Sequence, residues 1–165
     1  PDMLNARERR VWVQEKLLAE YPGVLVSFTL NIPGPVKVLP HVPEAFEFAF
    51  QEIISVLKKA GVTILTRSLI LDKTGPEAFL CVDADAVNVK RLLVPLEDGS
   101  KLGRLYDIDI IGRDGKKISR SDIGRPGRTC LLCGRPAREC SRSRTHSVEE
   151  LTMEINRIFA DSFEK

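Results

Sequence analysis

The order of apolar patterns in the middle of the chain restricts the folds open to it more than any other feature of the sequence. The strand patterns cover residues 24–30, 62–71, 78–82 and 104–111, and the helix patterns cover residues 44–60 and 85–94. Gly61 is expected to end the first helix, whereas Asp85 is placed to cap the second, which would run to about Val94 with Pro95 and Asp98-Gly99 ending it. This order of strand, helix, strand, strand, helix and strand predicts an α+β sandwich of the split β-α-β, ferredoxin-like kind. Its helices would cover one face of a mainly antiparallel sheet.

A further helix is predicted before the first strand. Residues 3–20 contain neither Gly nor Pro, and Tyr21-Pro22-Gly23 ends the pattern. Arg7, Arg10 and Gln14 are spaced three and four apart, so they would share one helical face. Taken alone, such a row most simply indicates a solvated surface stripe.

The chain is expected to finish with a Cys-, His- and Arg-rich loop over residues 125–146 and a last helix. Ser147 and Glu150 form a capping box at the start of that helix. Its expected buried stripe consists of Val148, Leu151, Ile155, Ile158 and Phe159. Because 165 residues suffice for one core and no repeat or convincing linker interrupts them, one domain over residues 1–165 is expected.

Positive charge is concentrated in one part of the chain. The formal net charge is only +2, but residues 112–146 hold ten basic and three acidic side chains, a local net charge of +7. Such a segment favours an anionic partner. No apolar run approaches the ~20 residues that a membrane-spanning helix needs, so a cytoplasmic protein without membrane contact is expected.

Two carboxylates are predicted to project together from the last strand. Because side chains alternate along a strand, Asp107 and Asp109 point to the same side with Leu105, and Tyr106 points to the other. Mg²⁺ binds one or two carboxylates together with phosphate oxygens, so this pair suits polyphosphate chemistry, with Arg104 placed to accept the charge of a leaving diphosphate. The similar Asp83-Ala84-Asp85 is better explained as a strand end followed by a helix cap.

The cysteines suggest a second metal site. Cys130, Cys133, Cys140 and His146 follow one another with two, six and five residues between them, which supplies four ligands for a structural, tetrahedral Zn²⁺. The alternatives are free thiols, with His146 acting in acid-base chemistry or on a substrate. Cys81 lies in an apolar strand and is expected in the core.

Taken together, the motifs resemble the citrate lyase holo-acyl-carrier-protein synthases, also called apo-citrate lyase phosphoribosyl-dephospho-CoA transferases. The resemblance covers nearly the whole chain and rests on the order and spacing of the pieces together. The downstream pieces are Leu102-Gly103-Arg104-Leu105-Tyr106-Asp107-Ile108-Asp109, Arg128-Thr129-Cys130-Leu131-Leu132-Cys133, Cys140 and Thr145-His146. The upstream pieces are Arg7-Glu8 with Arg10 and Gln14, Val26-Ser27-Phe28-Thr29, Pro33-Gly34-Pro35 with Lys37, and Gly75-Pro76-Glu77.

This resemblance implies a transfer reaction. The substrates would be 2'-(5''-triphosphoribosyl)-3'-dephospho-CoA and the apo acyl carrier (gamma) subunit of citrate lyase, whose serine receives the prosthetic group while diphosphate leaves. Asp107 and Asp109 would be the catalytic residues and would bind Mg²⁺. The expected substrate-binding residues are Arg104, Lys37, Arg7, Arg10 and Arg128. The related carrier of malonate decarboxylase is an alternative acceptor.

Two other functions fit parts of the sequence. The first is a zinc-containing nucleic-acid-binding module with its arginines on phosphates. Residues 112–145 contain no aromatic side chain on which a base could stack, which counts against that alternative. The second is a non-catalytic subunit that only docks on the carrier protein.

Overall fold

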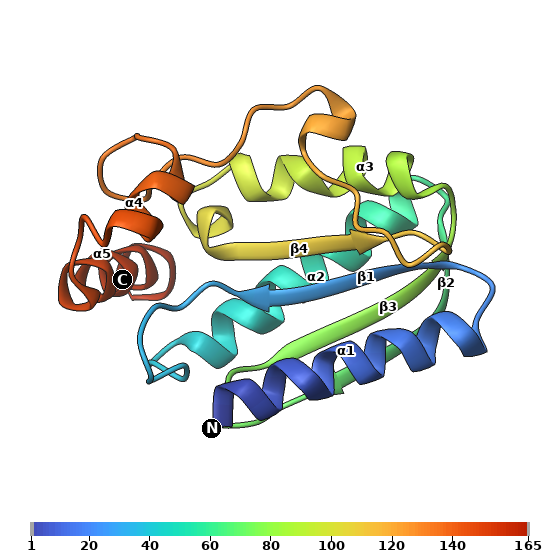
Figure 1. Cartoon of the computed structure of the whole chain (residues 1–165), viewed down its shortest axis with the longest axis horizontal. Helices are drawn as coiled ribbons and strands as arrows, with labels where there is room; N and C mark the ends of the chain where they lie inside the picture. Colours follow the sequence, from blue (N-terminus) through green and yellow to red (C-terminus); the bar gives the residue numbers. More distant parts are fainter. Residues whose placement is uncertain (1, 165) are drawn as a thin grey trace.

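The structure, a computed structural model that describes residues 2–164, is built around a four-stranded sheet (Figure 1). Its strands are β1 (Val24–Leu30), β2 (Thr63–Ile70), β3 (Glu77–Asp83) and β4 (Tyr106–Ile111). They lie in the order β2-β3-β1-β4, and each pair of neighbours is antiparallel. The prediction of an α+β chain with an antiparallel sheet is therefore confirmed. The bounds of β1 are those that its apolar run predicted.

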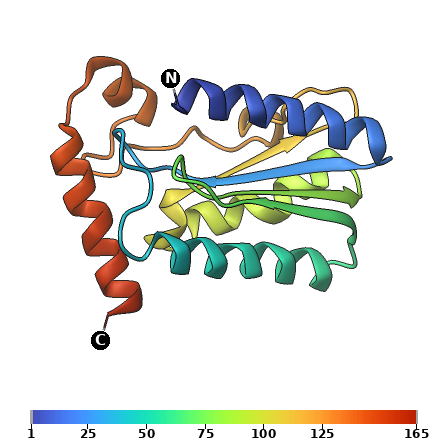
Figure 2. The ribbon, with the colours of Figure 1, turned by 90° about the horizontal axis from the view of Figure 1, so that it is seen from below.

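Helices cover both faces of this sheet (Figure 2). On one face, α2 (Val42–Lys59) and α3 (Ala86–Asp98) pack on Val26 and Phe28 of β1, which form the larger core with them. On the other face α1 (Asp2–Glu20) places Leu17 against Leu25, Phe79 and Cys81. The expectation that helices cover a single face was therefore wrong for α1. The alternation along β1 is the physical reason, because its odd-numbered side chains are also apolar or small and need cover.

Helix α3 extends beyond its predicted end. Pro95 lies inside the helix, which continues to Asp98. A proline costs a helix one backbone N–H donor, and the last turn of α3 is nevertheless held by a contact outside the helix. Glu97 is buried and its carboxylate accepts a hydrogen bond of 2.9 Å from the backbone N–H of Ile108. The prediction failed because this contact comes from a residue eleven positions away.

Strand β4 begins later than predicted. Residues Leu102–Leu105 form a short 3-10 helix, η1, so Arg104 and Leu105 do not belong to the strand. Leu105 is buried in the larger core and does not share a side with the two aspartates. Ser100 holds the turn, because its hydroxyl oxygen accepts a hydrogen bond from the backbone N–H of Gly103.

The C-terminal part of the chain closes one end of the sheet, where β1 ends and β4 begins (Figures 1 and 2). After the 3-10 turn η2 (Ser121–Ile123), the predicted loop contains a short helix, α4 (Ala137–Ser143), that the sequence analysis did not anticipate. The predicted capping box is confirmed at the start of α5 (Val148–Phe163). The last three members of the expected stripe are buried, whereas Val148 is exposed because it precedes the part of α5 that packs on the core.

Candidate functional site

A pocket of about 670 Å³ lies at this closed end of the sheet. Its walls come from the loop after β1, from η1 at the start of β4, and from residues 128–155. Lys37, Arg104, Arg128 and Arg144 all line it, and these cations come from segments up to 107 positions apart. The pocket therefore suits an anionic ligand. It unites three of the five residues that the sequence analysis assigned to substrate binding.

Lys37 is held at the pocket by its own loop. Its ammonium group donates a hydrogen bond of 2.6 Å to the carbonyl oxygen of Ile32. Partial burial lowers the pKa of Lys37, and the nearby positive charge of Arg7 lowers it further. An anion bound here would relieve that repulsion. Arg7 itself is exposed and lies on α1, close enough to influence this lysine.

The two arginines near η1 hold the C-terminal segment against the sheet. The guanidinium of Arg128 donates hydrogen bonds to the carbonyl oxygens of Tyr106 and Arg104, at 2.5 and 2.6 Å. Arg104 donates to the carbonyl oxygen of Thr129 at 2.8 Å. Both guanidinium groups thus have structural contacts, and Arg128 is the more fully occupied because it also lies 3.7 Å from the buried Glu97.

The predicted pair of carboxylates is found on the face of the sheet that α1 covers. Ile108 and Ile110 belong to the core on the opposite face, so Asp107 and Asp109 project together on the α1 side of β4. Asp107 is opposite Thr29 of β1, and Asp109 is opposite Ser27. Lys117 is the nearest cation, with its ammonium nitrogen 3.3 Å from the Asp109 carboxylate.

The pKa of the Asp107 carboxyl group is raised above its usual value. The first cause is the displacement of water by surrounding protein atoms, although the residue as a whole remains exposed. Repulsion from Asp109 and Glu97 raises the pKa further, and the charges of Arg128 and Lys117 oppose this. A divalent cation between the two aspartates would remove their mutual repulsion, so this pair can accept one.

Helix α1 brings polar side chains to the same face. Arg10 forms an ion pair with the buried carboxylate of Glu77, and Gln14 donates a hydrogen bond of 3.1 Å to the hydroxyl of Ser27. The interpretation of this row as a solvated stripe was therefore wrong for Arg10 and Gln14. In the register of the sheet Thr29 lies between Glu77 and Asp107.

Glu77 and Thr29 are polar residues of this cluster for which the sequence predicted no role. Glu77 is almost completely buried, and Arg9 and Arg10 both lie within ion-pair distance of it. The sequence around Glu77 gives little indication of a functional role, because a single acidic residue at the start of an apolar strand resembles the end of a turn. Glu77 is recognised as part of a polar cluster only in the folded protein, where α1 packs over the strand.

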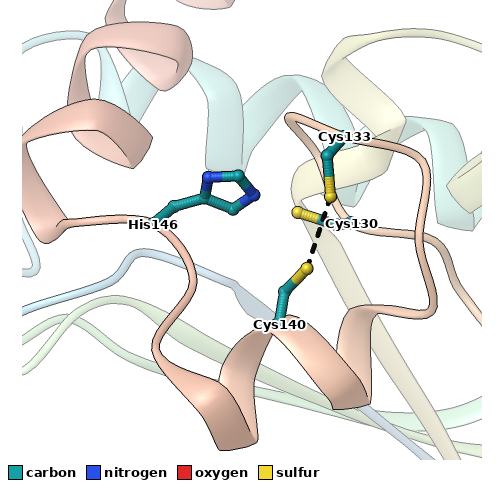
Figure 3. A group of neighbouring side chains, drawn as sticks. All are labelled: Cys130, Cys133, Cys140 and His146. Atoms are coloured by element: carbon teal, nitrogen blue, oxygen red, sulfur yellow. Dashed lines mark hydrogen bonds between the residues drawn. The ribbon is translucent and has the colours of Figure 1, made fainter.

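The four side chains of the second predicted constellation come together (Figure 3), and Cys130, Cys140 and His146 also line the pocket. The ligand atoms of Cys130, Cys133, Cys140 and His146 all lie within 4.8 Å of one another. Ligands around a tetrahedral zinc ion are about 3.5–3.8 Å apart, so side-chain movements of about 1 Å would complete such a site. The Nε2 atom of His146 is buried, has no hydrogen-bond partner among residues 2–164, and points toward the sulfur atoms. This cluster could hold a metal ion such as zinc.

The thiols of this cluster affect one another. The nearby imidazole of His146, together with polar contacts to the backbone of Arg135 and to Cys140, lowers the pKa of Cys133 to about 6. The same contact with Cys133 raises the pKa of Cys140 to about 11, and the two sulfur atoms are 3.4 Å apart. Cys81 is separate from the cluster and buried, which confirms its predicted place in the core.

Fold and site together define an α+β protein with a cation-lined pocket, a neighbouring pair of carboxylates and a cluster able to bind metal. In the part of the chain that the structure describes, no helix is both long and apolar enough to span a membrane.

Comparison with known proteins identifies the family. A sequence model of the apo-citrate lyase phosphoribosyl-dephospho-CoA transferases matches residues 1–162. The chain is 34% identical over 162 residues to the transferase of that name from Citrobacter koseri, covering 98% of this chain and 88% of the relative. It is 38% identical to a probable transferase of the same name from Streptococcus pyogenes serotype M18, with 99% and 86% covered. For the corresponding protein of Vibrio cholerae serotype O1 the identity is also 38%, with 96% and 90% covered. The chain belongs to the apo-citrate lyase phosphoribosyl-dephospho-CoA transferase family.

Proposed function

We propose that this enzyme transfers the phosphoribosyl-dephospho-CoA group from 2'-(5''-triphosphoribosyl)-3'-dephospho-CoA to a serine of the acyl carrier (gamma) subunit of apo-citrate lyase. The serine oxygen bonds to the phosphorus nearest the ribose, the bond from that phosphorus to the diphosphate breaks, and the serine proton is released. Family membership supports the class of reaction. One structural observation supports the location of this reaction in the protein. It is the cation-lined pocket, with a pair of carboxylates that project together from the neighbouring strand.

Asp107 and Asp109 are the proposed catalytic residues. They lie on one side of β4, which starts directly after the pocket-lining Leu105, and neither of them lines the pocket. A triphosphate bound in the pocket would therefore have to extend along the start of β4 to meet them. Mg²⁺ held by this pair would neutralise charge on the phosphate oxygens. The two carboxylates are fixed by the register of β4 on β1, which limits their movement and favours one geometry for transfer.

Lys37 and Arg104 are the proposed contacts for the departing diphosphate. Both line the pocket, and Lys37 carries a charge that its surroundings destabilise, so an anion is its natural partner. Arg7 contributes through its charge near Lys37. Arg10 and Arg128 act by positioning, because their guanidinium groups are engaged with Glu77 and with backbone carbonyls.

The experiment that tests this function combines purified protein, apo carrier subunit, the triphosphoribosyl precursor and Mg²⁺. Mass spectrometry of the carrier should show the added phosphoribosyl-dephospho-CoA group. Asp107→Asn should reduce the transfer rate on the order of 100-fold or more if Asp107 binds the metal that stabilises the transferring phosphate. Asp83→Asn is the matched control, since Asp83 is an exposed aspartate at the far end of β3. Near-normal transfer by Asp107→Asn would remove that residue from the mechanism.

A nucleic-acid-binding function is not favoured. Members of the family are named for a protein substrate, and the basic segment carries no aromatic side chain for base stacking. We also infer one ferredoxin-like domain. The strand order β2-β3-β1-β4 supports it, because two split β-α-β units place β1 between β3 and β4.

We further propose that the Cys/His cluster holds Zn²⁺ with a structural role. Three thiols and one imidazole match the ligands that zinc prefers, and no position remains open for a reacting group. Zinc would satisfy the buried Nε2 atom of His146, which has no other partner in the described chain. The segment between residues 125 and 146 has only two buried side chains, Cys130 and Cys140, so the ion would supply most of its support.

A further inference from the structure

The positive charge of residues 112–146 is neutralised unevenly. Arg120 and Arg125 form ion pairs with Asp98, and Arg120 and Arg128 lie near the buried Glu97. These three arginines therefore serve the packing of the C-terminal segment on α3. They contribute little to a surface that a partner could recognise.

Three other arginines have no such role. Arg135, Arg138 and Arg142 are exposed, and within residues 2–164 none of them takes part in an ion pair or a side-chain hydrogen bond. We call these three the arginine face. Glu139 is the sole acidic residue between positions 123 and 148, so a single carboxylate in this segment stands against the three arginines. An unbalanced group of exposed cations costs self-repulsion, which an anionic partner relieves.

Arg138 and Arg142 lie on the side of α4 that points away from the pocket, and Arg135 precedes the helix. The residues of α4 and its C-cap that line the pocket are Ala137, Cys140, Ser141 and Arg144. At 3.6 residues per turn, Arg138 and Arg142 are centred roughly 130° around the helix from that group. Helix α4 is thus the wall between the pocket and the arginine face. It is also anchored from within, because Cys140 belongs to the metal-binding cluster.

We propose that the arginine face is the docking surface for an acidic patch on the carrier protein. This inference rests on the proposed function, in which a protein serine must reach a phosphate bound in the pocket. A carrier that docks on the outer side of α4 lies about one helix diameter, ~10 Å, from the pocket. Charge on an exposed surface guides encounter and orientation, and it changes the chemical step little. A protein is favoured over nucleic acid as the occupant, because the arginine face has no aromatic residue beside it on which bases could stack.

The chain offers a matched control at the other end of β4. Arg113 and Lys116 are also exposed cations without an acidic side-chain partner in the described structure, and they flank the turn that follows β4. Since β4 starts at the pocket and rises ~3.3 Å per residue, this turn lies roughly 20 Å from it. The variants R138E/R142E and R113E/K116E change the net charge equally, so they differ only in position.

The test measures transfer to the apo carrier, separating the KM for the carrier from the KM for the triphosphoribosyl precursor. R138E/R142E should raise the KM for the carrier on the order of 10-fold and leave kcat and the KM for the precursor within about twofold. R113E/K116E should leave all three unchanged. The wild-type KM for the carrier should rise with salt, and R138E/R142E should flatten that dependence. Circular dichroism and metal content check that both variants fold alike.

Other outcomes overturn the proposal. Equal changes in the KM for the carrier in both variants would show that a diffuse electrostatic field, and not a docking surface, attracts the carrier. No change in R138E/R142E would exclude the arginine face as the docking surface. Tighter binding of single-stranded RNA than of carrier, lost in R138E/R142E, would assign the face to nucleic acid. If wild-type protein fails to modify the carrier, the proposed function fails. Fluorescence anisotropy with labelled apo carrier then tests docking separately, and equal binding by wild type and R138E/R142E refutes it.

Discussion

If the Cys/His cluster holds Zn²⁺ as proposed, its removal should open residues 130–146 and leave the rest of the protein folded. The sheet, α2 and α3 form a core to which only Leu131 of this segment contributes, as a partly buried residue. Within the segment itself Cys130 and Cys140 are buried, and both are ligands in the cluster. An ion bound by the cluster, as we propose, would therefore control the opening of residues 130–146, whereas the hydrogen bonds of Arg128 and Thr129 keep the start of the segment against the sheet.

The size of the effect follows from binding linkage. An ion present at about 1,000 times its dissociation constant stabilises the closed form by about 4 kcal/mol, so its loss raises the open population about 1,000-fold. Three cysteine ligands and a histidine make this degree of saturation a reasonable expectation at micromolar zinc. Backbone hydrogen bonds within the segment, such as that from Thr145 to the carbonyl of Cys140, resist opening by a smaller amount.

Limited proteolysis with trypsin measures this population directly, because cleavage follows the open form when closing is fast. Chelator should accelerate cleavage after Arg138 and Arg142 by on the order of 100-fold or more, with far-UV circular dichroism nearly unchanged. His146→Ala should be cleaved at the chelated rate without chelator. Cys81→Ala, which removes a thiol outside the cluster, should keep one zinc per chain by elemental analysis. Equal cleavage with and without chelator, or purified protein without zinc, would refute the reasoning.

Two further predictions concern stability. His41 lies 2.7 Å from a carboxylate oxygen of both Glu44 and Glu164, which raises its pKa because each carboxylate can only accept a proton donor. The stabilisation by this contact is fully present below pH ~6.5 and is lost as the pH rises through the raised pKa. Thermal unfolding should therefore show a Tm difference between wild type and His41→Gln at pH 5.5, and this difference should disappear by pH 8.5. Arg120→Met should lower the free energy of unfolding by about 3 kcal/mol in urea titrations, because it leaves the buried carboxylate of Glu97 with weaker compensation, and a loss below about 1 kcal/mol would contradict this.

Local patterns in the sequence predicted the elements whose structure depends on near neighbours. The apolar run of β1, the face of α2 and the caps of α3 and α5 follow from residues a few positions apart. The end of α3 did not follow, because Pro95 suggested a stop that the distant contact of Glu97 with Ile108 overrides. For the same reason the covering of the second sheet face by α1 could not be predicted, since it depends on which side chains meet across three strands.

The candidate site divides in the same way. Period-two alternation predicted that Asp107 and Asp109 share a side, and short-range spacing predicted the Cys/His cluster. The meeting of Lys37 with Arg104 at one pocket required the order of the strands, which places the end of β1 beside the start of β4. Glu77 was missed because its significance lies in the ion pair with Arg10, a residue 67 positions away.

The arginines of the C-terminal segment serve two different purposes, and their acidic neighbours decide which. Where Glu97 and Asp98 are within reach, arginine fixes the segment to α3 and its charge is satisfied inside the protein. Beyond that reach the chain supplies almost no acid, so the remaining cations must find their counter-charge in a ligand or a partner. The boundary between the two groups falls at the metal-binding cluster. A rigid Cys/His cluster at that position would hold the exposed arginines beside the pocket. It would also prevent them from reaching Glu97 and Asp98 and forming ion pairs there.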